Sequence, residues 1–104
     1  EFSVCPKICN NPGNSYHEWF IEFNKVPNNL PAFSSYLNQM MINQNIYYKD
    51  LIISGVISNL KIQLVKNGGF NGYMKSIGKF GGQNKCPHLS NGRKIAEFLL
   101  KNYV

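Results

Sequence analysis

Residues 78–88 of this 104-residue chain have the residue types and spacing most suited to binding or catalysis. They read Gly-Lys-Phe-Gly-Gly-Gln-Asn-Lys-Cys-Pro-His. Glycines let a backbone approach an anion closely and adopt positive φ. Amide side chains donate hydrogen bonds, and lysine adds a point charge. The spacing is not that of a P-loop, and a polar surface turn is the alternative interpretation. We expect a site for a phosphate or a developing oxyanion built from Lys79, Gly81, Gly82, Gln83, Asn84 and Lys85.

Two other pairs of side chains have residue types that could do chemistry. Cys86 and His88 could touch in a tight loop as nucleophile and base, but acidic residues that would orient the histidine are scarce. Glu18 and Glu22 fall on one face of a predicted strand, ~13 Å apart. That spacing is too wide for a glycosidase-like pair. We expect both glutamates to be solvated and neither pair to be catalytic.

The chain is basic, with 11 Lys and Arg against 5 Asp and Glu and a formal net charge of +6. A basic balance favours an anionic partner, although scattered lysines can also serve solubility alone. Arg93 is the sole arginine. Because arginine is the usual reader of bases and phosphates, its scarcity argues against nucleic acid.

The three cysteines are a poor disulfide framework, because their number is odd and no spacing repeats. Cys5 and Cys9 could begin a zinc site only if the fold brought two further ligands to them. We therefore expect no metal, and reduced cysteines of a cytoplasmic protein. The candidates for the missing ligands would be His17, Cys86 and His88.

No apolar run is long enough to span a membrane, and no signal peptide is visible. The chain opens at Glu1, without Met, directly on a strand-like sequence. We expect an excised domain with no membrane partner.

Hydrophobic periodicity and turn residues predict three strands and three helices. Asn29 is a suitable N-cap, Gly78 a suitable C′ residue, and Ser90 a suitable cap for the last helix. The order β-β-α-β-α-loop-α predicts an α+β fold, with a small mixed or antiparallel sheet of three to four strands and helices packed on it. The strands are expected at 2–5, 15–23 and 60–65, and the helices at 30–52 with an interruption near 43–46, at 70–77 and at 91–103.

Alternation along residues 15–23 places Trp19 and Ile21 on one face of a strand, and Phe20 on the other. We expect the first face to lie inside. The predicted core consists of Trp19, Ile21, Phe33, Leu37, Ile62, Leu64, Met74, Phe98 and Leu99.

The loop and its continuation, Gly-Lys-Phe-Gly-Gly-Gln-Asn-Lys-Cys-Pro-His-Leu-Ser-Asn, closely resemble the C-terminal signature of the Gretchen Hagen family. These are the auxin-responsive acyl acid amido synthetases and their bacterial relatives, and the bacterial type fits best. The resemblance covers essentially the whole chain, including residues 16–23, 69–70 and 93–94. Two loop positions depart from the pattern: Cys86 replaces the usual Val, and His88 replaces the usual Arg. Gly92 also replaces a residue that is often acidic.

The resemblance implies that residues 1–104 form the mobile C-terminal lid of a larger adenylate-forming ligase. Such an enzyme activates a carboxylic acid with ATP and Mg²⁺ and passes the acyl group to an amine such as an amino acid. By similarity, Lys85 is the catalytic lysine that reaches the α-phosphate and the reacting carboxylate, with His88 as a possible accessory residue. The partner is the large N-terminal adenylation domain of the same parent chain, and the lid has no turnover alone.

The competing interpretation is a free-standing basic module that binds nucleic acid or another anionic partner. A purely structural interaction domain, in which the loop is only a turn, is a third.

Overall fold

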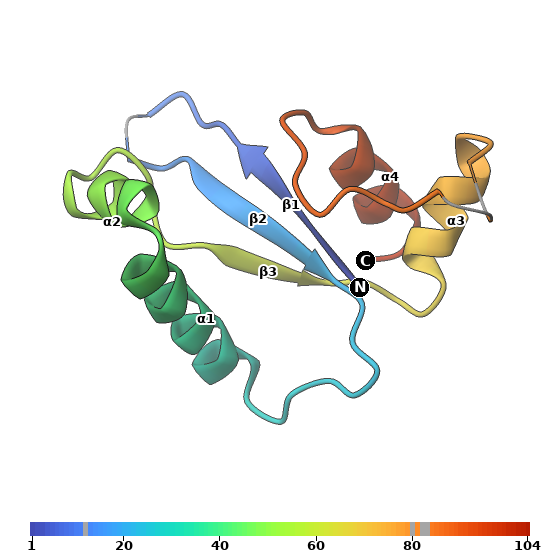
Figure 1. Ribbon diagram of the computed structural model, residues 1–104, viewed down its shortest axis with the longest axis horizontal. Helices are drawn as coiled ribbons and strands as arrows, with labels where there is room; N and C mark the ends of the chain where they lie inside the picture. The colour runs from blue at the N-terminus through green and yellow to red at the C-terminus, as the bar shows by residue number, and fades with distance from the viewer. Residues whose placement is uncertain (12, 80, 82–83) are drawn as a thin grey trace.

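The computed structural model describes residues 1–11, 13–79, 81 and 84–104 (Figure 1). These residues form three strands and four helices, which confirms the predicted α+β class. The helix predicted over 30–52, with an interruption near 43–46, is divided in the structure into two separate helices. The elements are β1 (Phe2–Lys7), β2 (Tyr16–Ile21), α1 (Leu30–Gln44), α2 (Ile46–Ile53), β3 (Lys61–Leu64), α3 (Gly69–Ser76) and α4 (Lys94–Asn102).

The three strands form a mixed sheet in the order β1-β2-β3. β1 and β2 pair antiparallel as a hairpin, with Val4 opposite Trp19. β3 pairs parallel with β2, with Ile62 opposite Trp19. Parallel neighbours need a long crossover, and here α1 and α2 provide it. β2 is therefore the central strand and is hydrogen-bonded to both β1 and β3.

Local sequence signals set most of the helix boundaries. The Asn29 side chain accepts a hydrogen bond from Ala32 N at 3.1 Å and caps α1. Asn45 ends α1, and its side chain accepts from Tyr48 N at 3.1 Å to begin α2, which explains the predicted interruption. The predicted cap at Ser90 is wrong, because α4 begins four residues later, at Lys94. The Ser90 hydroxyl instead lies 3.4 Å from the Gly92 backbone.

The main core lies between the sheet and the helices α3 and α4. Phe20 is fully buried there, whereas Trp19 and Ile21 are half-buried on the opposite face, so the predicted inner face of β2 is wrong. Both faces of β2 carry apolar side chains, and alternation alone cannot tell which face the helices cover more tightly. The core cluster is Cys5, Phe20, Val65, Phe70, Tyr73, Met74, Cys86, Ile95, Ala96 and Leu99.

The remaining predicted core residues have mixed outcomes. Met74 and Leu99 are buried as expected, and Phe98 packs against the core from its edge. Leu64 is 37% exposed, so its assignment to the core is wrong. Three others are only half-buried, because they belong to the second, less covered side of the sheet: Phe33, Leu37 and Ile62.

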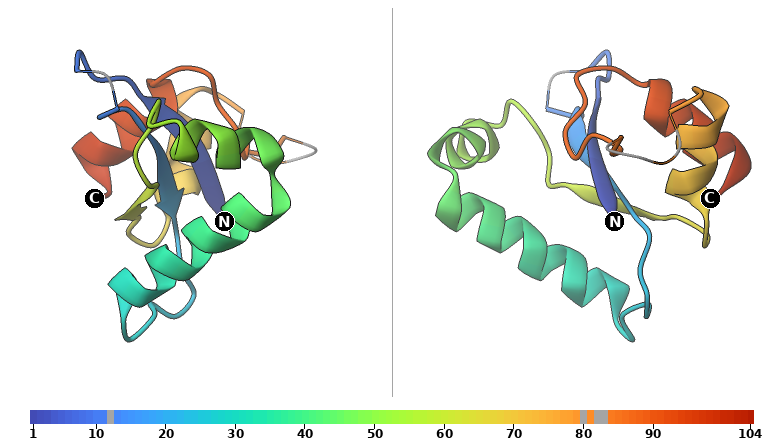
Figure 2. Two further views of the ribbon diagram at one scale, coloured as in Figure 1. Left: turned by 90° about the vertical axis from the view of Figure 1, so that its left-hand side faces the viewer. Right: turned by 45° about the vertical axis from the view of Figure 1, so that its right-hand side comes forward.

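Helices α1 and α2 lie on the side of the sheet away from α3 and α4 (Figures 1 and 2). Tyr48 of α2 is buried, and the His17 ring of β2 packs against it at a tilt of 36°, with ring centroids 5.3 Å apart. Asn38 of α1 is also buried and accepts hydrogen bonds from the Tyr48 hydroxyl and, at 3.2 Å, from Leu60 N. These contacts fix the crossover to the start of β3.

Candidate functional site

The glycine-rich loop leaves α3 in a direction that backbone geometry fixes. Gly78 has φ +72°, the left-handed conformation expected of a C′ glycine. Its N–H donates to Lys75 O at 3.1 Å, and Lys79 N donates to Met74 O at 2.9 Å. This pair of bonds is a Schellman motif. The exposed Lys79 side chain therefore starts from a defined helix end.

In the middle of the loop, Gly81 and Asn84 are hydrogen-bonded to each other. Gly81 has φ +92°, and its carbonyl accepts from both Asn84 N at 3.4 Å and Asn84 Nδ2 at 3.3 Å. Lys85 follows Asn84 and is exposed. The predicted site residues Gly82 and Gln83 lie outside the described part of the chain.

The end of the loop is attached to β1. The Ser3 hydroxyl donates to Pro87 O at 2.8 Å, and Val4 N donates to His88 O at 2.8 Å. Ser90 N returns a bond to Val4 O at 2.9 Å, and Val4 and Leu89 form a parallel bridge. The residues just after Lys85 thus extend the sheet edge.

Cys86 and His88 do not form a nucleophile–base pair. Cys86 is buried in the core, where burial raises the pKa of its thiol to about 11. A reactive cysteine needs a lowered pKa instead. His88 is 65% exposed, stacks on Phe2 with ring centroids 4.3 Å apart, and has Nε2 3.7 Å from Glu1 Oε1. Cys86 anchors the loop, and His88 lies on the surface beside it.

The expectation that Glu18 is solvated is wrong. It is buried, with Oε1 2.8 Å from Arg93 Nη1 and Oε2 accepting from Gln63 Nε2 at 2.9 Å. Arg93 Nη1 also donates to Pro6 O at 3.2 Å. This network ties all three strands to the residue that precedes α4. The sequence signal was the position of Glu18 on the same face as Phe20.

Glu22 is not free in solvent either. Its carboxylate accepts from Gly68 N at 3.1 Å and from Phe70 N at 3.3 Å, so it caps the start of α3. A carboxylate is favourable at a helix N-terminus, where backbone N–H groups lack partners. These partners are 46 and 48 residues away in sequence, and no local pattern could have found them.

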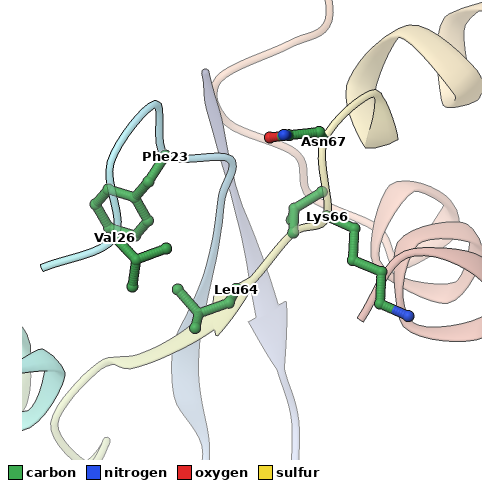
Figure 3. A pocket seen from close by; sticks show the side chains of 6 residues that line it. Phe23, Val26, Leu64, Lys66 and Asn67 are labelled. Atoms are coloured by element: carbon green, nitrogen blue, oxygen red, sulfur yellow. The ribbon is translucent and has the colours of Figure 1, made fainter.

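A separate hollow of about 310 Å³ lies where β3 ends (Figure 3). Phe23, Val26 and Leu64 give it an apolar wall, while the Lys66 side chain extends away from them. None of the described loop residues lines it. The hollow is therefore not part of the candidate site.

Within residues 1–11, 13–79, 81 and 84–104, no three His, Cys, Asp or Glu side chains gather in a way that could hold a metal ion. Across the same ranges, the helices are too short or too polar to cross a membrane.

Both the sequence and the fold of this chain are similar to those of known proteins. The family model described as the GH3 family C-terminal domain matches residues 1–94. The solved structure of GH3.15 acyl acid amido synthetase superposes with a TM-score of 0.75 at 17% identity, covering 100% of this chain and 19% of that one. AtGH3.15 acyl acid amido synthetase in complex with 2,4-DB gives 0.71 at 19% identity, covering 100% and 20%.

No curated protein matches the chain. The two structural matches, both below 25% identity, show a shared fold, and the chain spans about a fifth of each. The family model covers nearly the whole chain, including the loop and its attachment to β1. This chain therefore belongs to the GH3 (Gretchen Hagen) family and corresponds to the C-terminal domain of that family.

Proposed function

We propose that residues 1–104 are a single domain that serves as the mobile C-terminal lid of an ATP-dependent acyl acid amido synthetase in the cytoplasm. Family membership supports this, as do two acyl acid amido synthetases of which the chain spans about a fifth. The shared core of the sheet, α3 and α4 supports movement as one body. The proposed reaction activates a carboxylic acid with ATP and transfers it to an amine such as an amino acid.

Lys85 is the proposed catalytic residue. The observation that carries this proposal is its placement, with an exposed side chain on a backbone anchored to β1 two residues later. Adenylation builds negative charge on the phosphate oxygens and on the attacking carboxylate. A cation held in place before the reaction stabilises that charge more in the transition state than in the ground state.

The loop residues before Lys85 would hold the nucleotide phosphates. Exposed Lys79 and Asn84 and the positive φ of Gly81 fit an anion, and Gly82 and Gln83 are proposed to share this role. His88 is a possible accessory group. The loop from 78 to 88 contains no Asp or Glu, so carboxylate ligands for Mg²⁺ would come from the large N-terminal domain. When bound, Mg²⁺ would neutralise phosphate charge.

The test is Lys85→Ala in the full-length protein that carries this domain. Acid-dependent pyrophosphate exchange is expected to fall at least ~100-fold, because one preorganised contact to developing charge is typically worth that much. Lys49→Ala, at an exposed lysine of α2, is the matched control and should exchange at the wild-type rate. Unchanged exchange in Lys85→Ala, with the fold intact, would reject the proposal.

A further inference from the structure

We propose that Ser3, on β1, is a positioning residue for Lys85, a role that rests on the function proposed above. Ser3 is fully buried, and its hydroxyl donates to Pro87 O at 2.8 Å across 84 residues of sequence. Pro87 follows Lys85 by two residues. Ser3 is too deeply buried to meet a substrate, so any effect it has on the reaction must pass through the loop.

The contacts on the two sides of Lys85 are unequal. On the N-terminal side, the described contacts of Asn84 are local, at 3.3 and 3.4 Å to Gly81 O. On the C-terminal side, Cys86 is buried in the core and the next residues bond to β1 at 2.8 to 2.9 Å. The backbone position of Lys85 is therefore set from β1.

The segment after Lys85 is attached to β1 at both of its ends. Ser3 holds Pro87 at one end, and Arg93 holds Pro6 O at the other, at 3.2 Å. Figures 1 and 2 show this segment running beside β1. If the domain rotates as a lid, this double attachment makes Lys85 move with the sheet. The lysine then reaches its place by rotation of the whole domain, not by flexing of the loop.

Removing the Ser3 hydroxyl frees Pro87 O, the loop atom to which it donates. A misplacement of about 1 Å in a reacting group can cost ~100-fold in rate, and the remaining bonds of Val4 keep the loop close. We therefore expect Ser3→Ala, in the full-length protein, to lower kcat for acid-dependent pyrophosphate exchange about 10-fold. KM for ATP and for the acid should change less than about twofold, because the residues proposed to hold the nucleotide phosphates lie before Lys85, on the side of the loop that Ser3 does not hold.

Ser58→Ala is the matched control. Its hydroxyl also donates to a distant backbone carbonyl, that of Gly13, but in the turn that joins β1 to β2. Both variants are assayed where thermal unfolding shows them folded, and only Ser3→Ala is expected to lose kcat. Ser3→Thr keeps the donor and should recover most of the loss. Equal kcat in Ser3→Ala and Ser58→Ala would overturn the positioning role.

A double variant shows whether Ser3 acts through Lys85. Adding Ser3→Ala to Lys85→Ala should not lower the residual exchange further, since the group being positioned is gone. A further 10-fold loss would overturn the role. If Lys85→Ala alone leaves exchange unchanged, the proposed function itself fails. If Lys85→Ala is inactive while Ser3→Ala behaves like Ser58→Ala, only the role of Ser3 fails.

Discussion

Arg93 joins the sheet to the start of α4. Its guanidinium contacts the buried Glu18 carboxylate at 2.8 Å and Pro6 O at 3.2 Å, immediately before α4. Gln63 completes the coordination of Glu18 from β3. A buried ion pair is retained well only when further hydrogen bonds support both partners, and here each partner has one, Glu18 from Gln63 and Arg93 to Pro6. The only arginine of the chain thus has a structural use.

Arg93→Ala should destabilise the domain by about 3 kcal/mol, because it leaves the Glu18 carboxylate buried and uncompensated. Denaturant unfolding measures this as a lower midpoint at unchanged slope. Arg93→Lys restores the charge but not the planar geometry, so it should fall in between. A loss below about 0.5 kcal/mol in Arg93→Ala, the range of ordinary surface substitutions, would contradict the assignment.

At the scale of elements, α3 is the helix that presents the loop, and it is fixed at both ends. Glu22 caps its first turn from β2, and Gly78 ends it in a Schellman motif. Its glycine at position 69 packs closely, since a Cβ there would lie 2.3 Å from Val65 Cγ1 and 3.3 Å from Tyr103. The direction in which the loop leaves α3 follows from these three constraints.

Two glycine substitutions should separate strain from crowding at α3. Gly78→Ala meets nothing within 4 Å but must adopt φ +72°, which costs about 1 kcal/mol. Gly69→Ala would ordinarily favour a helix by up to about 1 kcal/mol. Here it should cost more than Gly78→Ala, because Val65 must move. Thermal unfolding of both variants gives the order, and a stabilising Gly69→Ala would show that the packing is looser than described.

At the scale of the whole molecule, the sheet has one well-covered face and one thinly covered face. The second face holds His17, whose burial against Tyr48 lowers the pKa of the imidazole below its ordinary value. Above about pH 6.5, the ordinary pKa of histidine, the ring is neutral in both the folded and the unfolded chain. Below that pH the unfolded chain binds a proton first, so stability falls as the pH falls.

Exchanging this histidine should therefore flatten the pH dependence of stability. His17→Phe keeps an aromatic ring against Tyr48 but removes the titration. Between pH 7 and pH 5, its free energy of unfolding should decline less than that of the wild type. Tyr47→Phe, at a tyrosine of α2 that is 79% exposed, serves as the control and should retain the wild-type decline. Equal slopes in His17→Phe and the wild type would show that other groups carry the dependence.

Two measurements on the isolated chain distinguish the proposed lid from the competing function of a free-standing basic module. The isolated chain should show no acid-dependent pyrophosphate exchange, because the proposed acid pocket belongs to the N-terminal domain. It should also give no salt-sensitive gel shift with RNA near physiological salt. Exchange by the chain alone would reject the lid proposal. A strong, salt-sensitive shift would favour the basic module.

The sequence alone determined the features that depend on neighbouring residues. The sequence predicts the cap at Asn29, the interruption near 43–46 and the C′ glycine at 78, because the bonds that form each of them join residues within four positions. The loop composition and its family resemblance were also in the sequence. The α+β class followed from the order of the elements.

Only the tertiary structure decided which surfaces and charges meet. β2 is apolar on both sides, so burial of Phe20 rather than Trp19 followed from where α3 and α4 pack. The partners of Glu18 and Glu22 lie more than forty residues away. The Ser3–Pro87 bond joins the two ends of the chain across 84 residues. Such contacts depend on how whole elements close on one another, and no local pattern encodes that closure.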